Sequence, residues 1–193
     1  MRKHLFAIPL VLAGALLALP GPAQATDADV EVVGSAFTPA KVRVGLGDQV
    51  VWTFTDQTRH TSTSDEDFWD SGLMNDGQTF TWTFRSAGTF GYGCTPHPSM
   101  RGRVRVPVQA VGSPSDGWVL RWATRPAPEG LDYDVQVRRK GADKWTWFRR
   151  NAEKATGTFD PARSGNWKIR ARTSNIDAGQ SSTWSPTRSV AVS

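Results

Sequence analysis

The sequence predicts an all-β protein made of two consecutive β-sandwiches. Three observations predict this class: short runs with apolar residues at every second position, Gly- and Pro-containing turns between the runs, and an abundance of Val, Thr, Trp and Phe. A single cysteine cannot form an internal disulfide, so packed cores must stabilise the fold. The nine tryptophans provide large apolar side chains for those cores.

The first 25 residues have the layout of a secretory signal peptide. Two basic residues precede an apolar run from Leu5 to Leu19, and an Ala-Gln-Ala triplet of the cleavage type follows. The run is short and contains Pro9, which argues against a membrane anchor. We therefore expect a mature chain over residues 26–193 without a membrane span, secreted or otherwise extracytoplasmic, in a periplasm or at the cell exterior.

The first sandwich is expected over residues 26–109. Its strands are predicted where apolar and polar residues alternate, because one face of each strand is then buried against the other sheet. In chain order, the apolar positions are Val30 and Val32; Val42 and Val44; Val50, Trp52 and Phe54; Phe80, Trp82 and Phe84; Phe90 and Tyr92; and Val104, Val106 and Val108. The acidic stretch 65–78 lacks this alternation, so we expect an irregular excursion between strands there.

A second sandwich is expected over residues 117–193. Gly, Ser, Pro and Asp interrupt the pattern at residues 110–116, and we interpret this stretch as a linker. Six short runs with strand composition follow it, at intervals typical of a sandwich. These runs are "WVLRWAT", "DYDVQVRR", "KWTWFRR", "TGTFD", "NWKIRARTS" and "TRSVAV".

The charge is divided unevenly between the two regions. Residues 26–109 carry seven basic and ten acidic side chains, a net charge of −3, whereas residues 110–193 carry 14 and 8, a net charge of +6. Such a split indicates two modules with different surfaces. We interpret the second module as suited to docking on an anionic cell-wall polymer or an acidic protein surface, and we expect no nucleic-acid binding.

The mature chain contains few residues that bind soft metals. It has one cysteine, Cys94, and two histidines, His60 and His97, and Met100 follows His97 by three positions. Two imidazoles and a thiolate with a weak axial thioether form a blue-copper electron-transfer site, whereas structural zinc has little use for a thioether. The set therefore favours one mononuclear copper ion bound by all four residues.

Each of these residues also has a purely structural interpretation. A lone buried cysteine is commonly an inert apolar residue, and a lone histidine is commonly structural. A reactive-cysteine enzyme, with Cys94 as nucleophile and His97 as base, is another functional interpretation, but no third group is evident that would orient the base. The four residues together favour copper, and we expect no enzymatic activity.

The first region resembles the small cupredoxins, near plastocyanin and pseudoazurin and closest to amicyanin. The resemblance covers about residues 28–108 and includes "AFTPAKVRVGLGDQVVWTFTD", "RHTSTS", "DSGLMNDGQTFTWTF" and the short ligand loop "CTPHPSM". It implies a Greek-key β-sandwich in which His60, Cys94, His97 and Met100 bind copper. It also implies that His97 is the solvent-facing edge through which electrons pass.

One position departs from the pattern of this family. Many members have Asn immediately after the first ligand histidine, where it joins the two ligand loops, and this sequence has Thr61 there. We expect the Thr61 hydroxyl to join the loops more weakly. Met74 is expected either at an apolar rim around the copper end or in ordinary packing.

Residues 117–193 resemble a fibronectin type III domain, which has an immunoglobulin-like fold. Trp122 on an early strand, "YDVQVRR", "WKIRARTSN" and "STWSPTRSV" carry this resemblance. The prediction is thus a monomeric, exported blue-copper protein that shuttles single electrons between Cu(II) and Cu(I), with an unidentified redox protein as partner. The alternative is an extracytoplasmic copper-binding protein for copper storage, delivery or stress protection, and the lack of Met- or His-rich tracts favours electron transfer.

Overall fold

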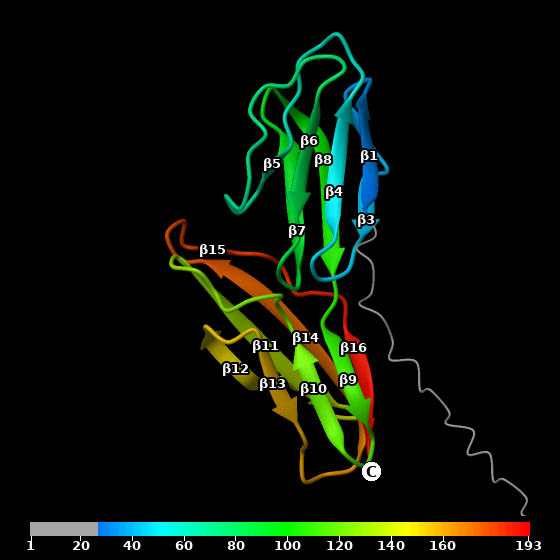
Figure 1. The fold of residues 1–193 in the computed structure, drawn as a ribbon, viewed down its shortest axis with the longest axis vertical. Coiled ribbons are helices and arrows are strands. Elements are labelled where there is room, and N and C mark those ends of the chain that lie inside the picture. The colour runs from blue at the N-terminus through cyan, green and yellow to red at the C-terminus, as the bar shows by residue number, and fades with distance from the viewer. Residues whose placement is uncertain (1–26) are drawn as a thin grey trace, which may run out of the picture.

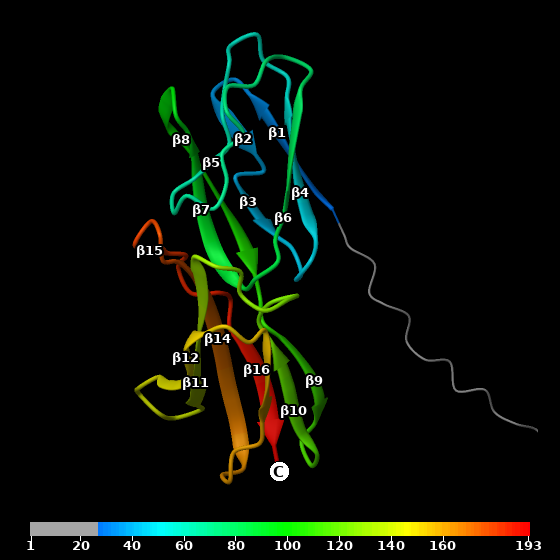
Figure 2. The same ribbon diagram turned by 60° about the vertical axis from the view of Figure 1, so that its left-hand side comes forward.

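A computed structural model describes residues 27–193, so the signal peptide predicted at residues 1–25 lies outside the described residues. The described chain is all-β, as predicted, with 16 strands in two sandwiches that lie end to end (Figure 1 and Figure 2). Over these residues, no helix is long and apolar enough to cross a bilayer.

The first sandwich contains two four-stranded sheets, in the orders β2-β1-β4-β6 and β3-β8-β7-β5. β1 pairs with β4, and β3 with β8, in parallel, and the other neighbouring pairs are antiparallel. The strands are β1 (Ala28–Val33), β2 (Ala36–Thr38), β3 (Lys41–Arg43), β4 (Gln49–Phe54), β5 (Thr63–Ser64), β6 (Thr79–Thr83), β7 (Gly88–Cys94) and β8 (His97–Val106).

The predicted alternation buries one face of each of the central strands. In β4, Val50, Trp52 and Phe54 are buried while the residues between them are partly exposed. The stretch between β5 and β6 contains no named strand, as expected for an excursion. Trp69 within it is nevertheless buried, with its ring centroid 5.9 Å from that of Trp52. Aromatic burial therefore anchors this excursion to the core.

The second sandwich is built from the remaining eight strands. One sheet has the order β13-β10-β9, and the other has the order β12-β11-β14-β15 with β16 also paired to β14. The strands are β9 (Gln109–Ser113), β10 (Gly117–Arg121), β11 (Leu131–Arg139), β12 (Thr146–Ala152), β13 (Thr156–Phe159), β14 (Gly165–Asn175), β15 (Gln180–Ser181) and β16 (Arg188–Val192). Their buried residues form a second core cluster, which also includes Ala87 and Val108, and Leu46 packs against both clusters.

The interpretation of residues 110–116 as a linker is wrong. Most of this stretch is strand β9, which pairs antiparallel with β10, and only the turn between them is irregular. The two strands approach closely at Gly112, whose φ is 145° and where a Cβ atom would collide with the carbonyl oxygen of Gly117. The Gly, Ser, Pro and Asp residues therefore mark a hairpin turn within the second sandwich and not a spacer before it.

Backbone hydrogen bonds join the two sandwiches at the start of β7. The amide of Ala87 donates to the carbonyl of Trp122 at 2.7 Å, and Thr89 and Thr183 exchange two hydrogen bonds of 2.8 and 3.0 Å. β7 starts at this junction and ends at Cys94, five residues beyond Thr89. At about 3.4 Å per residue, Cys94 lies about 17 Å along β7 from the contact at Thr89.

Glu66 is a buried carboxyl group beside the same junction. Its carbonyl oxygen accepts a hydrogen bond of 3.1 Å from Nδ2 of Asn175, and its side chain accepts one of 3.2 Å from the Ser64 hydroxyl. Burial, with a smaller contribution from the charge of Asp65, raises the pKa of Glu66 to about 7. The carboxyl therefore keeps its proton over a pH range in which an exposed glutamate is ionised.

Candidate metal centre

The four predicted ligands lie on the β7–β8 hairpin and on the segment that precedes β5. Cys94 ends β7, His97 begins β8, and Met100 lies within β8. His60 comes from the segment between β4 and β5. Cys94 lies opposite His97 in the antiparallel ladder, where the register shifts after Gly93. The expected ligand loop is thus mostly a strand, and a tight turn brings its donors back towards Cys94.

The donor atoms of three of these residues converge. Sγ of Cys94 lies 3.6 Å from Nδ1 of His60 and 3.4 Å from Nδ1 of His97. The ligand atoms of all three lie within 4.8 Å of one another, and the two imidazole centroids are 4.7 Å apart. Both rings therefore direct the same kind of nitrogen towards one thiol.

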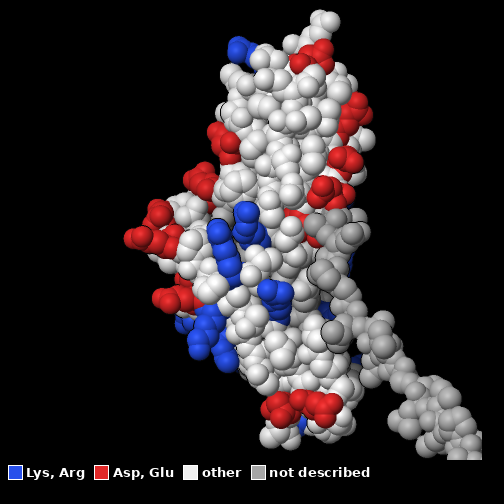
Figure 3. All heavy atoms as spheres, viewed as in Figure 1, with Lys and Arg blue, Asp and Glu red and all other residues white. Residues whose placement is uncertain are grey.

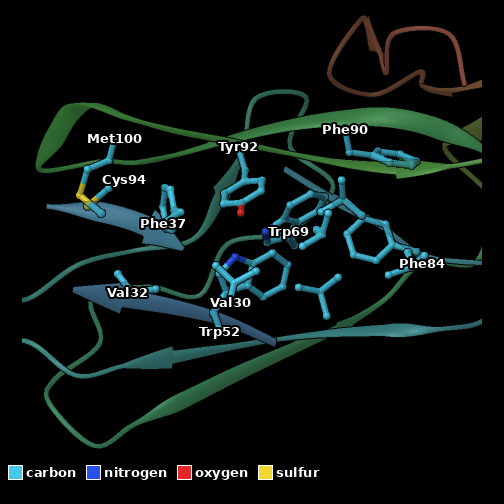
Figure 4. Packing of buried hydrophobic residues seen from close by; sticks show 14 of the residues in the cluster. Val30, Val32, Phe37, Trp52, Trp69, Phe84, Phe90, Tyr92, Cys94 and Met100 are labelled. Carbon is cyan, nitrogen blue, oxygen red and sulfur yellow. The ribbon is translucent and has the colours of Figure 1, made fainter. Parts of the chain in front are cut away.

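Met100 supplies the fourth donor. Its side chain is buried in the same core cluster as Cys94, and Figure 4 shows both side chains at one end of that core. Met74, for which rim and packing roles were both open, packs against this cluster, and its backbone exchanges hydrogen bonds of 2.8 and 3.3 Å with His60. The structure therefore brings all four predicted residues together.

The donor set fits a copper ion. Donors bound to one metal by bonds of about 2.0 Å from nitrogen and about 2.3 Å from sulfur lie about 3.5–3.7 Å apart at tetrahedral or trigonal angles. The observed separations of 3.4 and 3.6 Å agree with these values within a few tenths of an ångström. Thiolate and thioether sulfurs with two imidazoles match copper better than metals that prefer oxygen donors.

Burial differs among the four ligands. His60, Cys94 and Met100 are at most 3% exposed, whereas His97 is only partly buried. Three ligands are thus closed to water, while the ring of His97 reaches the surface. An electron-transfer partner would therefore come nearest to the centre at this ring.

Asp56 orients the buried histidine, His60, a role that was not predicted from the sequence. Its Oδ2 lies 3.4 Å from Nε2 of His60, the ring nitrogen that faces away from Cys94. Backbone N–H groups of Thr58 and Gly34 donate to the same carboxylate at 3.0 and 2.9 Å, and they lower the pKa of Asp56. A charged acceptor on the outer nitrogen fixes the tautomer that leaves Nδ1 free for a metal. In the sequence, this role was indicated by an acidic residue four positions before a ligand histidine.

Thr61 joins the two ligand segments through a hydroxyl network. Its Oγ1 accepts a hydrogen bond of 2.8 Å from the amide of Thr95 and one of 2.9 Å from the Thr63 hydroxyl. Its own amide donates to Sγ of Cys94 at 3.3 Å. The Thr61 hydroxyl therefore joins the two ligand segments, as expected, and the hydroxyls of Thr63 and Thr95 add further hydrogen bonds between these segments.

Comparisons with known proteins agree with this centre. The family model described as "Copper binding proteins, plastocyanin/azurin family" matches residues 25–107. Amicyanin-alpha of Methylorubrum extorquens is 30% identical over 106 residues, which cover 52% of this chain and 89% of the relative. Amicyanin of Paracoccus versutus is 34% identical over 95 residues, which cover 44% and 72%.

Solved structures of amicyanin also match. A variant in the reduced Cu(I) form at pH 4 shares 30% sequence identity, covering 41% of this chain and 80% of that one, with a TM-score of 0.39. The family match and the converging donors together show one type 1 copper site formed by His60, Cys94, His97 and Met100.

Proposed function

Because the chain belongs to the plastocyanin/azurin family of copper-binding proteins, we propose that it is an exported carrier of single electrons. Bound copper supplies a couple between Cu(II) and Cu(I). The chain is not an enzyme, since amicyanins and plastocyanins are electron carriers without catalytic activity. For the second sandwich we propose a separate role, in docking.

One observation carries the proposal: three ligands are buried and held by the fold, and the fourth reaches the surface. Asp56 fixes His60, the Thr61 amide and hydroxyl restrain Cys94 and its turn, and the core surrounds Met100. Donors held in this way move little when the charge of the metal changes, which favours fast electron exchange. A storage or delivery protein must instead release its metal, and three buried ligands oppose release.

Spectroscopy and electrochemistry of the purified protein test this function. Addition of one equivalent of Cu(II) is expected to give an intense visible charge-transfer band, a narrow copper hyperfine pattern in electron paramagnetic resonance and a reversible one-electron wave. Cys94→Ser should remove the band because the thiolate produces it, whereas exposed Thr81→Val should leave it unchanged. Rapid transfer of copper to an acceptor apoprotein, without reversible redox behaviour, would favour storage or delivery instead.

We further propose that the second sandwich is a docking module of the fibronectin type III type. Two observations support this: it has its own core, and it carries most of the basic residues of the chain. In Figure 3, separate acidic groups lie along the edges of the upper sandwich, and most of the blue side chains visible in this view lie at mid-height and on the lower sandwich, which also carries some acidic groups. A basic module at the end away from the copper would hold the carrier on an acidic surface while His97 stays accessible.

We also propose where the protein is located and how it assembles. Export through the signal peptide at residues 1–25 would place the protein outside the cytoplasmic membrane, in a periplasm or at the cell exterior. We propose a monomer that meets a redox protein at the surface around His97. Fractionation of expressing cells and light scattering of the purified protein test these two points, and a cytoplasmic or oligomeric protein would contradict them.

A further inference from the structure

One face of the second sandwich carries a set of cations that electron transfer does not use. Lys168, Arg170 and Arg172 point outward from β14, because Ile169 and Ala171 between them are buried in the core. The basic face, as we call it, comprises Arg138, Arg150, Lys168, Arg170 and Arg172 together with the indoles of Trp145, Trp147 and Trp184.

The guanidinium groups of this face are stacked against indole rings. Cζ of Arg170 lies 4.1 Å from the ring centre of Trp145 and 4.4 Å from that of Trp184. Cζ of Arg138 lies 4.8 Å from Trp145, and Cζ of Arg172 lies 4.9 Å from Trp184. Stacking restricts side chains that are otherwise flexible, so the cations are already positioned before any ligand arrives.

Most of this positive charge has no counter-charge. Of the five cations, within the part of the chain that the structure describes, only Arg172 forms an ion pair, at 2.8 Å to Asp134. Arg170 donates to the neutral oxygen of Gln136 at 2.7 and 3.1 Å. Burial and the nearby charges of Arg138 and Arg172 lower the pKa of Arg170. Crowded like charges cost free energy, and an anionic ligand would offset that cost.

The geometry suits a flexible anionic chain better than a folded protein or a nucleic acid. Alternate residues of β14 are about 6.8 Å apart, so its cations form an evenly spaced row. The centre of a protein interface is more apolar than its rim, and guanidinium groups cover the rings of Trp145 and Trp184 that could form such a centre here; of the three indoles, only that of Trp147 is classed as exposed, at 46%. The covered rings also offer little surface on which bases could stack.

We propose that the basic face binds a linear phosphate polymer without bases, such as an anionic polymer of the cell envelope. Four of its five cations are arginines, whose planar guanidinium groups match phosphate oxygens in pairs. The inference rests on the docking role proposed for the second sandwich, and it specifies the ligand. The metal centre lies at the far end of the first sandwich, so polymer binding leaves the ring of His97 free (Figure 1).

Calorimetric titration of the copper-loaded, two-sandwich protein with inorganic polyphosphate tests this assignment. The four cations that form no ion pair predict a slope of log K against log salt concentration of about −2.8. Binding should therefore weaken about 50-fold between 50 and 200 mM salt. Binding that ignores ionic strength would overturn the proposal.

A triple variant locates the site on the molecule. Arg138→Gln/Arg150→Gln/Lys168→Gln removes three cations and keeps the ion pair of Arg172 with Asp134. Arg170, the one unpaired cation that remains on this face, predicts a slope of about −0.7 and an affinity at 50 mM salt that is lower by more than tenfold. An unchanged slope and affinity would refute the assignment.

A second triple variant with the same change in net charge is the matched control. Lys41→Gln/Arg125→Gln/Lys154→Gln alters exposed positions elsewhere, and its affinity should fall less than about threefold. Equal losses in the two variants would mean that net charge alone matters, which would overturn the proposal. Tighter binding of a single-stranded oligonucleotide or of poly-glutamate, at equal charge, would also overturn it. The visible copper spectrum reports separately on the copper site in every variant.

Discussion

Replacement of Thr61 by valine tests whether one hydroxyl couples the two ligand segments. Valine keeps the shape of the side chain and removes its oxygen. The Thr63 hydroxyl keeps another acceptor, Oδ1 of Asp70 at 2.9 Å. The amide of Thr95, which donates to Thr61 at 2.8 Å, loses its acceptor. The substitution therefore costs the free energy of one partly buried, unsatisfied N–H group.

That cost sets the size of the expected effect. An unsatisfied buried donor destabilises a protein by about 1–3 kcal/mol, and partial solvent contact at Thr95 places this case near the lower end. Guanidinium unfolding of the metal-free protein should therefore show a loss of about 1–2 kcal/mol. In the copper-loaded protein, the freer turn should also slow electron self-exchange, measured by line broadening in nuclear magnetic resonance.

Two further variants make the result decisive. Thr61→Ser restores the acceptor and should recover most of the lost stability and the exchange rate. Thr81→Val, at an exposed position of β6, should change stability by less than about 0.5 kcal/mol. If Thr61→Val were as stable as the parent and exchanged electrons as fast, the hydroxyl would not couple the segments and the reasoning would be refuted.

Three other predictions follow from the same centre and its surroundings. Asp56→Asn should weaken copper binding about tenfold in competition with a chelator, because a neutral acceptor orients His60 less firmly; unchanged affinity would contradict this. Met100→Leu should keep the visible band and raise the potential in voltammetry, by about 59 mV for each tenfold loss of relative affinity for Cu(II); a lowered potential would disprove the axial role. The raised pKa of Glu66 means that the folded state holds its proton more tightly, so stability should fall, by on the order of 1 kcal/mol, as pH rises from about 4.5 to about 7. Glu66→Gln should remove this slope in unfolding curves measured across that range, and a slope that persists would assign it to another group.

The strands of the first sandwich could be predicted because apolar residues recur at every second position along them, on the face that is buried. Val50, Trp52 and Phe54 alternate with polar residues and are buried as the alternation requires. The same reasoning failed at residues 110–116, because turn residues look alike within a hairpin and between domains. Only the pairing of β9 with β10 distinguishes the two cases.

The ligand set could be predicted for a different reason. Residues 26–193 contain one cysteine and two histidines, so chemistry alone limited the choice of ligands, and Met100 lies three positions after His97. Asp56 and Thr95 could not be identified in this way, since aspartates and threonines are common and their roles depend on which atoms they meet. Thr95 meets Thr61 across 34 positions of the chain, and Asp56 meets His60 through the conformation of the segment that joins β4 to His60.

The amino-acid sequence by itself thus determined the all-β class, the metal and its four ligands, because periodicity and scarce donor atoms are properties of a chain. Only the tertiary structure decided that Asp56 supports His60, that a threonine network joins the ligand segments, and that arginines and tryptophans of the second sandwich stack on one face. The threonine network and the arginine–tryptophan stacking depend on distances between residues remote in sequence, and the contact of Asp56 with His60 depends on the conformation of the segment between them; folding alone fixes both.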